Sequence, residues 1–577
     1  MLARLLRADE PSVYLHAPWE DVADGLLARP PLREGLGRAH LEVRTRVPLA
    51  QAYFDQGLRL LHLGWGSEAR RAFAEAARLD PELGMAWWGL ALTRGSGARF
   101  AADRAEAIRR ALALSEGAPD VEQRYVVAAS LLADKGPANG RPAFIREMEF
   151  LIDRYPEDAE ARLLLAGFLL DGYEPDGRPG QGQAYAQALL RELLRTHPDH
   201  AGVHHAWVQA MLHGPRPEAA QDSALRLVRL APEASPALLS AGRLLRRVGL
   251  ADEARHALEA AVSADDAYLA AEGLPTLAAP SAEAAMRLLA QGCAEAGQYR
   301  GAQTWARRLR HRVEGAGSEP QALLFAASTL VAAHLRFGFW LAAAEVPLEL
   351  PEEATAAEAG LRDGLRLYTR GVAALEAGKL AEVGRACDAL DALHPRLAEE
   401  RRAEGRALCP RDVARVVEVA AHELRGAWEA RRGEPGRAEA TLIRALRLER
   451  RVRAAGPAPF SRPARETLAR ARLRAGREDK ALELALALAA ERPGCGHYRL
   501  LVAESHAAHE DWAEAQAHFT AFLEQWREAD PRLPELGRAR AFLSRQGRVL
   551  RLVRPQEGLV PPEADAPAFR PLEKVSC

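Results

Sequence analysis

Small, apolar and proline residues recur along this chain with a period of 34 positions. The first clear period covers 50–83, and its markers at positions 8, 20, 24, 27 and 32 are Gly57, Ala69, Phe73, Ala76 and Pro81. The small residues mark places where two helices approach closely, and the proline cannot continue a helix. The pattern therefore predicts antiparallel helix pairs, each of which buries its apolar face only against neighbouring pairs.

The same period continues downstream. The units starting at Ala201 and Ser235 lie 34 residues apart, and so do those starting at Arg462 and Gly496. Less regular units start at Gly84, Tyr125, Ala159, Glu283, Gly364 and Val419. The Ala159 unit carries a glycine- and proline-rich insertion, 171–183, which we expect to loop out between its two helices.

This period and its markers are those of the tetratricopeptide repeat (TPR). We predict an all-α fold, a right-handed α-solenoid of TPR-type helix–turn–helix repeats over 50–545. Residues 1–49 are assigned to an irregular N-terminal lead-in, and 546–577 to a proline-rich, mobile C-terminal tail that follows a capping helix around 534–548.

Composition narrows the possible functions. The net charge is −1 and the pI is about 7, so the chain as a whole has no attraction for nucleic acid or membrane surfaces. Five widely spaced cysteines without a C-x-x-C pair indicate packing thiols in a reducing compartment. The N-terminus lacks a secretory signal and no apolar run reaches about 20 residues, so we expect a cytoplasmic protein.

Catalytic motifs are missing from the sequence. It contains no G-x-S-x-G, no Walker loop and no H-E-x-x-H, and the repeats occupy nearly the whole chain. We therefore predict that the protein is not an enzyme and has no cofactor.

One candidate site lies on the first helix of the Ala201 unit. His205, Gln209 and His213 stand at positions 5, 9 and 13, a stripe that faces the concave side of a solenoid. A metal site needs at least three converging ligands. Two histidines two turns apart favour a hydrogen-bonded polar groove over a metal site.

The same stripe continues as a basic patch. In the next unit it reads Leu239, Arg243, Arg246 and Arg247, and in the unit after that Arg287 and Gln291. Arginines facing one groove are suited to the carboxylates of an acidic peptide or to a phosphate. The alternative is a set of solvated arginines paired with Glu253 or Glu259.

Aromatic residues mark the first units. Phe54 and Trp88 occupy position 5 of successive units, where we expect exposure on the concave wall, whereas Trp87 at position 4 is expected in the core. Exposed rings there would anchor a partner or be covered by residues of 1–49. A second histidine-rich stretch, His497 to His518, contains a His506/His509 pair that is predicted to lie on a solvated face.

The chain also resembles a family. The runs 50–58, 72–73, 80–81 and 85–91 are similar to the start of bacterial multi-repeat TPR proteins without an assigned activity, and the similarity continues through 199–220, 329–347 and 423–531. Members carry histidines and an acidic residue at positions 5, 9 and 12 of one unit and 5 and 9 of the next. Here only His205 matches, because the other positions read Gln209, Leu212, Leu239 and Arg243. The resemblance implies a dismantled metal-like site, so we expect no stoichiometric transition metal.

Together these patterns predict a non-enzymatic scaffold that binds a protein or peptide segment, possibly acidic, in its concave groove. The predicted groove residues are Phe54, Trp88, His205, Gln209, His213, Arg243 and Arg247. We expect no nucleic-acid or membrane partner. The alternative is a ligand- or metal-dependent sensor or enzyme with a groove site between the units starting at Ala201 and Ser235.

Overall fold

Helices make up most of the described chain, in a computed structural model that describes residues 29–93, 101–174, 177–274, 276–279, 281–314, 320–401, 408–452 and 460–553. Within these residues the one β-type pairing is an isolated bridge between Tyr173 and Pro179. The prediction of an all-α fold is confirmed. No described helix is both long and apolar enough to cross a bilayer.

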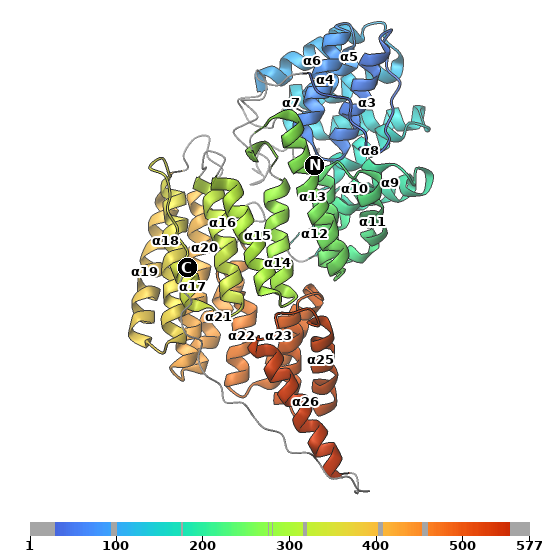
Figure 1. Ribbon diagram of the computed structural model, residues 1–577. Coiled ribbons are helices and arrows are strands. Elements are labelled where there is room, and N and C mark those ends of the chain that lie inside the picture. Colours follow the sequence, from blue (N-terminus) through green and yellow to red (C-terminus); the bar gives the residue numbers. More distant parts are fainter. Residues whose placement is uncertain are drawn as a thin grey trace.

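The helices follow one another as antiparallel pairs (Figure 1). The first pairs are α3 (Pro48–His62) with α4 (Gly66–Leu79), α5 (Gly84–Thr93) with α6 (Ala101–Ser115), α8 (Ala159–Leu169) with α9 (Gln183–Thr196), α10 (Ala201–Met211) with α11 (Gln221–Leu230), and α12 (Ser235–Arg247) with α13 (Ala251–Glu272). Short 3-10 turns, η2 (Pro217–Ala220) and η3 (Thr276–Ala278), lie in the connections. We call the region α3–α13 the N-terminal coil, where coil means a winding of the solenoid and not irregular structure.

The second half continues the series. Its pairs are α14 (Ser281–Glu295) with α15 (Tyr299–Glu314), α16 (Pro320–Arg336) with α17 (Trp340–Glu345), α18 (Ala356–Glu376) with α19 (Leu380–Glu399), α20 (Pro410–Arg431) with α21 (Pro435–Glu449), α22 (Ala464–Arg474) with α23 (Glu478–Glu491), and α24 (Gly496–Ala508) with α25 (Trp512–Gln525). A single helix, α26 (Pro534–Val553), ends the described chain at the predicted capping position. We call α14–α26 the C-terminal coil.

Between α6 and α8 lies the long helical element α7 (Asp120–Arg154). Arg124 pairs with Glu147 at 2.9 Å, although 23 residues of straight helix would separate them by roughly 35 Å. The chain therefore doubles back within α7, and its two arms form the helix pair that was predicted from Tyr125. The predicted insertion likewise loops out between α8 and α9, where Gly180 N–H donates to the Gly172 carbonyl at 2.8 Å.

The repeat markers pack as their spacing predicts. A Cβ atom on Gly57 would lie 2.6 Å from the ring of Phe73, and one on Gly242 would lie 2.6 Å from Leu258. Real Cβ atoms do not approach so closely, so glycine is required where the two helices of a pair cross. The described chain is an α-solenoid of TPR-type helix pairs.

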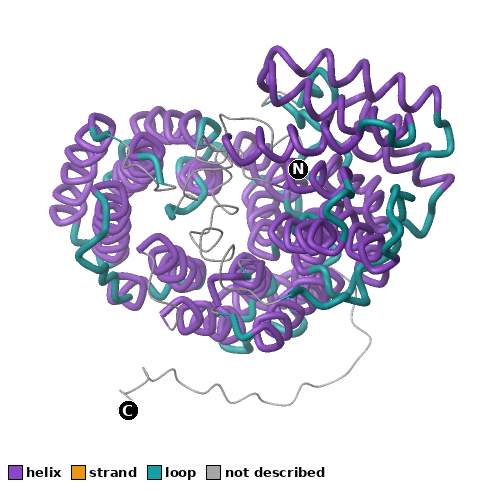
Figure 2. The backbone as a smooth tube through the Cα atoms, turned by 90° about the horizontal axis from the view of Figure 1, so that it is seen from above, coloured by secondary structure: helices purple, strands orange, loops and turns teal. Residues whose placement is uncertain are grey.

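Each coil also makes contacts between units that are distant in sequence. In the N-terminal coil α3 lies against α10. In the C-terminal coil the α25–α26 turn returns to the α14–α15 turn, where Trp526 Nε1–H donates to the Glu295 carbonyl at 2.9 Å and Asp530 N–H donates to the Gly297 carbonyl at 3.0 Å. Seen from above, many of the helices are arranged in a ring, and the others lie to one side of it (Figure 2).

Candidate functional site

The structure corrects the predicted exposure of the aromatic residues. Phe54 and Trp88 are 0% and 2% exposed, and their rings lie 6.4 Å apart in the core. Trp88 also packs edge-on against Tyr125 of α7. Trp87, which was expected in the core, is instead half-buried beneath the guanidinium of Arg110. The two positions are exchanged because α7 covers the side of α5 that was predicted to line a groove.

Residues of the lead-in also cover this region. Tyr53 donates its hydroxyl hydrogen to the Pro30 carbonyl at 2.8 Å, and Gln56 accepts from Arg33 N–H at 2.7 Å. Leu36 and Val43 are buried in the same core as the first helix pairs. Of the two explanations for the aromatic residues, burial that includes residues of 1–49 fits this packing, and an exposed anchor does not.

His205 lies in the buried contact between α3 and α10, which we call the N-terminal seam, rather than in an open groove. It is 3% exposed, and its Nδ1–H donates to the His62 carbonyl of α3 at 2.7 Å. Its Nε2 lies 3.2 Å from the Gln209 amide, which also donates to Ser240 Oγ of α12 at 2.7 Å. Burial lowers the pKa of His205 to about 4, so the ring is neutral at pH 7. The predicted hydrogen bonding is present, but α3 fills the space where the groove was expected.

The predicted basic patch is dispersed. Arg247 donates to the carbonyls of Leu212 and Gly214, and so caps the end of α10. Arg246 pairs with Glu295 at 2.7 Å, not with the predicted Glu253 or Glu259. Arg243 is half-buried on α12, and His213 is exposed beyond the end of α10.

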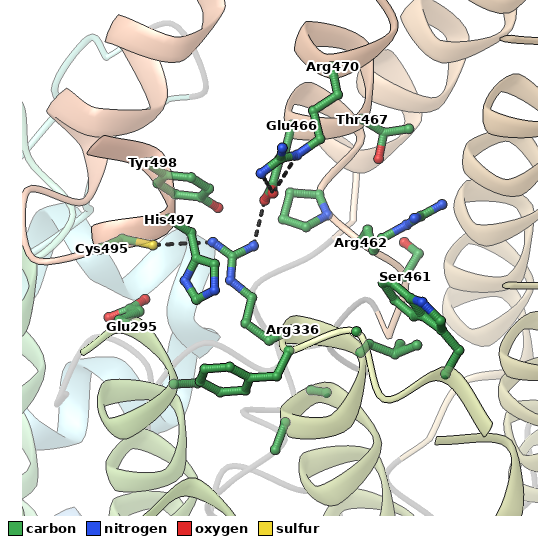
Figure 3. A pocket seen from close by; sticks show the side chains of 18 of the residues that line it. Glu295, Arg336, Ser461, Arg462, Glu466, Thr467, Arg470, Cys495, His497 and Tyr498 are labelled. Carbon is green, nitrogen blue, oxygen red and sulfur yellow. Dashed lines mark hydrogen bonds and ion pairs between the residues drawn. The ribbon is translucent and has the colours of Figure 1, made fainter. Parts of the chain in front are cut away.

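A cavity of about 570 Å³ lies inside the C-terminal coil (Figure 3). We call it the central pocket; its walls come from α14, α16, α18, α20, α22, α24, α26 and the segment 460–463. Its charged lining consists of seven arginines and four glutamates: Arg287, Arg336, Arg462, Arg470, Arg474, Arg492, Arg538, Glu295, Glu376, Glu466 and Glu535. Its volume is within the range of ligand pockets, roughly 300–1,000 Å³.

One end of the central pocket contains neutralised ion pairs. Arg336 pairs with Glu466 at 2.6 Å, and its second terminal nitrogen donates to Cys495 Sγ at 3.3 Å (Figure 3). Burial alone would raise the pKa of Glu466, but Arg336 and Arg470 outweigh this effect and lower the pKa to about 2. Nearby, Arg492 pairs with Glu295 at 3.2 Å.

The other end has surplus positive charge. Arg462 Nε lies 3.1 Å from Glu423 and its Nη1 lies 3.6 Å from Glu376. Its Nη2 is buried without a hydrogen-bond partner among the described residues, as is the hydroxyl of Ser461. Arg474 stands on α22, two turns after Glu466, and no described acidic group lies within ion-pair distance of it. Partial desolvation in the pocket and the neighbouring Arg431, Arg470 and Arg462 lower the pKa of Arg474, against the opposing charge of Glu376, although the residue as a whole is exposed. An anion placed here would relieve this repulsion.

The stripe predicted from the sequence includes only two of the residues that line the central pocket. Arg287 and Gln291, the last members of the predicted stripe, line the central pocket, whereas none of the seven predicted groove residues does. Of the His506/His509 pair that was predicted on a solvated face, His509 is exposed and bonded to Asp479 at 2.7 Å, whereas His506 is half-buried and stacks on His518. Residue His497 of the same stretch is buried in the central pocket.

Potential metal ligands are dispersed over the described part of the chain. Nowhere in its described residues do three or more histidine, cysteine, aspartate or glutamate side chains converge in a way that would hold a metal ion. Cys293, Cys387 and Cys495 are buried free thiols. Burial raises the pKa of Cys495, which keeps the thiol protonated beside Arg336.

These features define the class of the protein: an α-solenoid of TPR-type units with an arginine-lined internal pocket. No protein-family model and no curated protein sequence matches the chain. Similar solved structures include an IFIT1 monomeric mutant with Gppp-AAAA (11% identity, TM-score 0.34, covering 91% of this chain and 98% of that one) and the APC/C hetero-tetramer Cut9–Hcn1 (13%, 0.30, 86% and 76%). The P58(IPK) TPR domain is another (15%, 0.21, 67% and 99%). Such low TM-scores carry no conclusion about ligands.

Proposed function

We propose that this protein is a non-enzymatic scaffold that holds an acidic segment of a partner protein in the central pocket of its C-terminal coil. The observation that carries the proposal is the charge of the lining, seven arginines against four glutamates, together with Arg474, which forms no ion pair among the described residues and is opposed only by the more distant charge of Glu376. Guanidinium groups bind carboxylates through paired hydrogen bonds, and a partly enclosed pocket strengthens such contacts.

A protein segment fits the lining better than a nucleic acid does. Bases bind mainly by stacking on free aromatic faces. In the central pocket Arg336 lies over the ring of Tyr498 at 5.2 Å and Arg462 over that of Trp340 at 6.0 Å. Phe337 and Phe460 are buried in the surrounding core. The described aromatic rings of the lining are thus covered or buried, and its arginines are what remains for recognition.

The test uses the purified full chain and fluorescein-labelled hexaglutamate, with binding followed by fluorescence anisotropy at low salt. We expect saturable binding that weakens as salt is added, and little binding of labelled hexalysine. Arg474→Glu should weaken hexaglutamate binding at least about tenfold, equivalent to about 1.4 kcal/mol. Arg437→Glu is the matched control, because Arg437 is 77% exposed on α21 and far from the pocket lining.

Two results would overturn the proposal. One is equal hexaglutamate affinity for the Arg474 and Arg437 variants, since binding would then not use the pocket. The other is tighter binding of labelled hexauridylate than of hexaglutamate with the same dependence on Arg474, which would assign the pocket to nucleic acid.

A further inference from the structure

His497 is the least satisfied polar side chain of the central pocket. It is only 4% exposed, and neither of its ring nitrogens has a hydrogen-bond partner among the described residues. Buried polar groups in proteins are almost always hydrogen-bonded. Phe337 and Trp526 hold the ring edge-on at 5.6 and 4.8 Å, and in Figure 3 it lies beside Arg336 in the pocket. The ring is therefore fixed in place with both nitrogens unused.

The backbone around His497 is also suited to an anion. His497 is the second residue of α24, a helix of 13 residues, and no side chain caps its N-terminus. Free backbone N–H groups and the helix dipole favour negative charge at such an end. A helix terminus alone would not define a site, but here an unpartnered buried histidine stands at it and lines the same cavity.

Titratable groups from several elements line the central pocket together with His497. They are Glu295 of α14, Arg336 of α16, Glu466 and Arg470 of α22, Arg492 before α24, Cys495 and Tyr498 of its own segment, and Glu535 and Arg538 of α26. Two glutamates of this group are each shared by two arginines, Glu466 by Arg336 and Arg470, and Glu295 by Arg246 and Arg492. The charges of Arg336, Arg470 and Arg538 act on the ring, so the surroundings of His497 favour an anion and keep the free ring unprotonated.

We infer that His497 is a recognition residue for one carboxylate of the bound segment, and that it takes up a proton when that carboxylate binds. This inference rests on the function proposed above. One ring N–H donates to the carboxylate, and the proton comes from solvent, so that a neutral ring becomes an imidazolium paired with the ligand. The inference names a monoanionic carboxylate because the imidazolium supplies a single positive charge.

In the free protein the His497 ring is neutral and can accept this proton. Burial, together with Arg336, Arg470 and Arg538, lowers the pKa of His497 well below its usual value, so the ring is neutral near pH 7. A bound carboxylate raises the pKa by charge interaction. Between the free and the bound pKa, affinity must fall as pH rises, by at most about tenfold per pH unit for one proton.

The experiment measures proton uptake directly. Hexaglutamate is titrated into the full chain by calorimetry at pH 6.5 in two buffers with different ionisation enthalpies, and its affinity is measured from pH 6 to pH 8. We expect uptake approaching one proton for wild type, and an affinity that falls with rising pH. His497→Gln keeps a donor and an acceptor but cannot gain charge, so it should bind several-fold more weakly, without proton uptake and with a flat pH profile.

His509→Gln is the matched control, because His509 is an exposed histidine next to the end of the same helix and should behave as wild type. His497→Asn serves as a second variant if circular dichroism shows that His497→Gln is misfolded. Hexaglutamate binding without proton uptake, or with uptake that persists in the His497 variants, would overturn this inference and leave the scaffold proposal standing. Absence of hexaglutamate binding to wild type would overturn both.

Discussion

The contact between α3, α8 and α10 in the N-terminal coil and the central pocket of the C-terminal coil both join distant helices, but their buried polar groups are paired differently. In the N-terminal coil, His62 of α3 donates to Glu160 at 2.6 Å, Glu160 lies 3.0 Å from His200, and both nitrogens of His205 are bonded. In the C-terminal coil, His497, Ser461 and one nitrogen of Arg462 have no partner among the described residues. An unsatisfied buried polar group costs about 1–3 kcal/mol. This difference is consistent with a structural role for the first contact and supports the proposal that the central pocket binds a ligand.

The largest expected effect is on the N-terminal seam. Burial opposes the ionisation of Glu160, but His62 and His200 outweigh it and lower the pKa to about 2. A carboxyl whose folded pKa is below its unfolded value, about 4.3, stabilises the fold above that value, here by about 3 kcal/mol. Glu160→Gln should remove this stabilisation at pH 7 and speed hydrogen exchange in α3 and α10, while hexaglutamate binding stays unchanged.

The sign of the pH effect gives a second readout for Glu160. The stabilisation is lost as pH falls from about 5 toward 2, so the difference between wild type and Glu160→Gln should shrink over that range. Glu157→Gln, at an exposed position just before α8, is the control and should leave exchange unaltered. A constant difference at all pH values would show that the seam does not depend on the charge of Glu160.

A matched pair of substitutions tests the comparison itself. His205→Phe leaves the buried His62 carbonyl without its side-chain donor, removes one contact of the Gln209 amide, and should lower the free energy of unfolding by about 2–3 kcal/mol. His497→Phe removes two unsatisfied atoms between aromatic rings and should change it by less than about 1 kcal/mol, in either direction, while hexaglutamate affinity falls. Urea unfolding with hydrogen exchange assigned to each coil measures both. Equal losses of stability would remove the distinction between the coils.

The smallest effect concerns Arg247, which sequence analysis placed in the binding groove. Because its guanidinium caps the last carbonyls of α10, Arg247→Met should cost about 1 kcal/mol of stability. Hexaglutamate affinity should not change. A tenfold loss of that affinity would show that Arg247 takes part in binding and that the site lies in the N-terminal coil.

The repeat pattern predicted the helix pairs because it encodes contacts between neighbours. Gly57 against Phe73 and Gly242 against Leu258 are local approaches at a fixed spacing, and such spacing is readable from sequence. Contacts such as His62 with His205 join residues 143 positions apart, and no repeat position encodes them. Phe54, Trp88 and His205 were therefore predicted on an open face that other units in fact cover.

The central pocket was not predicted, again because the repeat pattern does not encode contacts between distant units. Arg336, Glu466 and His497 belong to three different helix pairs that meet only when the coil turns back on itself. Among the residues that line the pocket, sequence analysis had singled out Arg287 and Gln291, because they continue the stripe that was predicted on the concave face. A buried histidine is also indistinguishable in sequence from the exposed His509 twelve residues later.

The return of the α25–α26 turn to α14–α15 has a consequence for the order of folding. Trp526 and the Glu295 carbonyl are 231 residues apart, whereas each helix pair closes over a few tens of residues. Closing a long loop is slower than forming local contacts, so the pairs form first and this contact forms late. During synthesis the chain through α26 must leave the ribosome before α24 and α26 can complete the walls of the central pocket. Nascent chains that end before Gly496 can therefore fold their first repeats but lack part of the lining of this pocket.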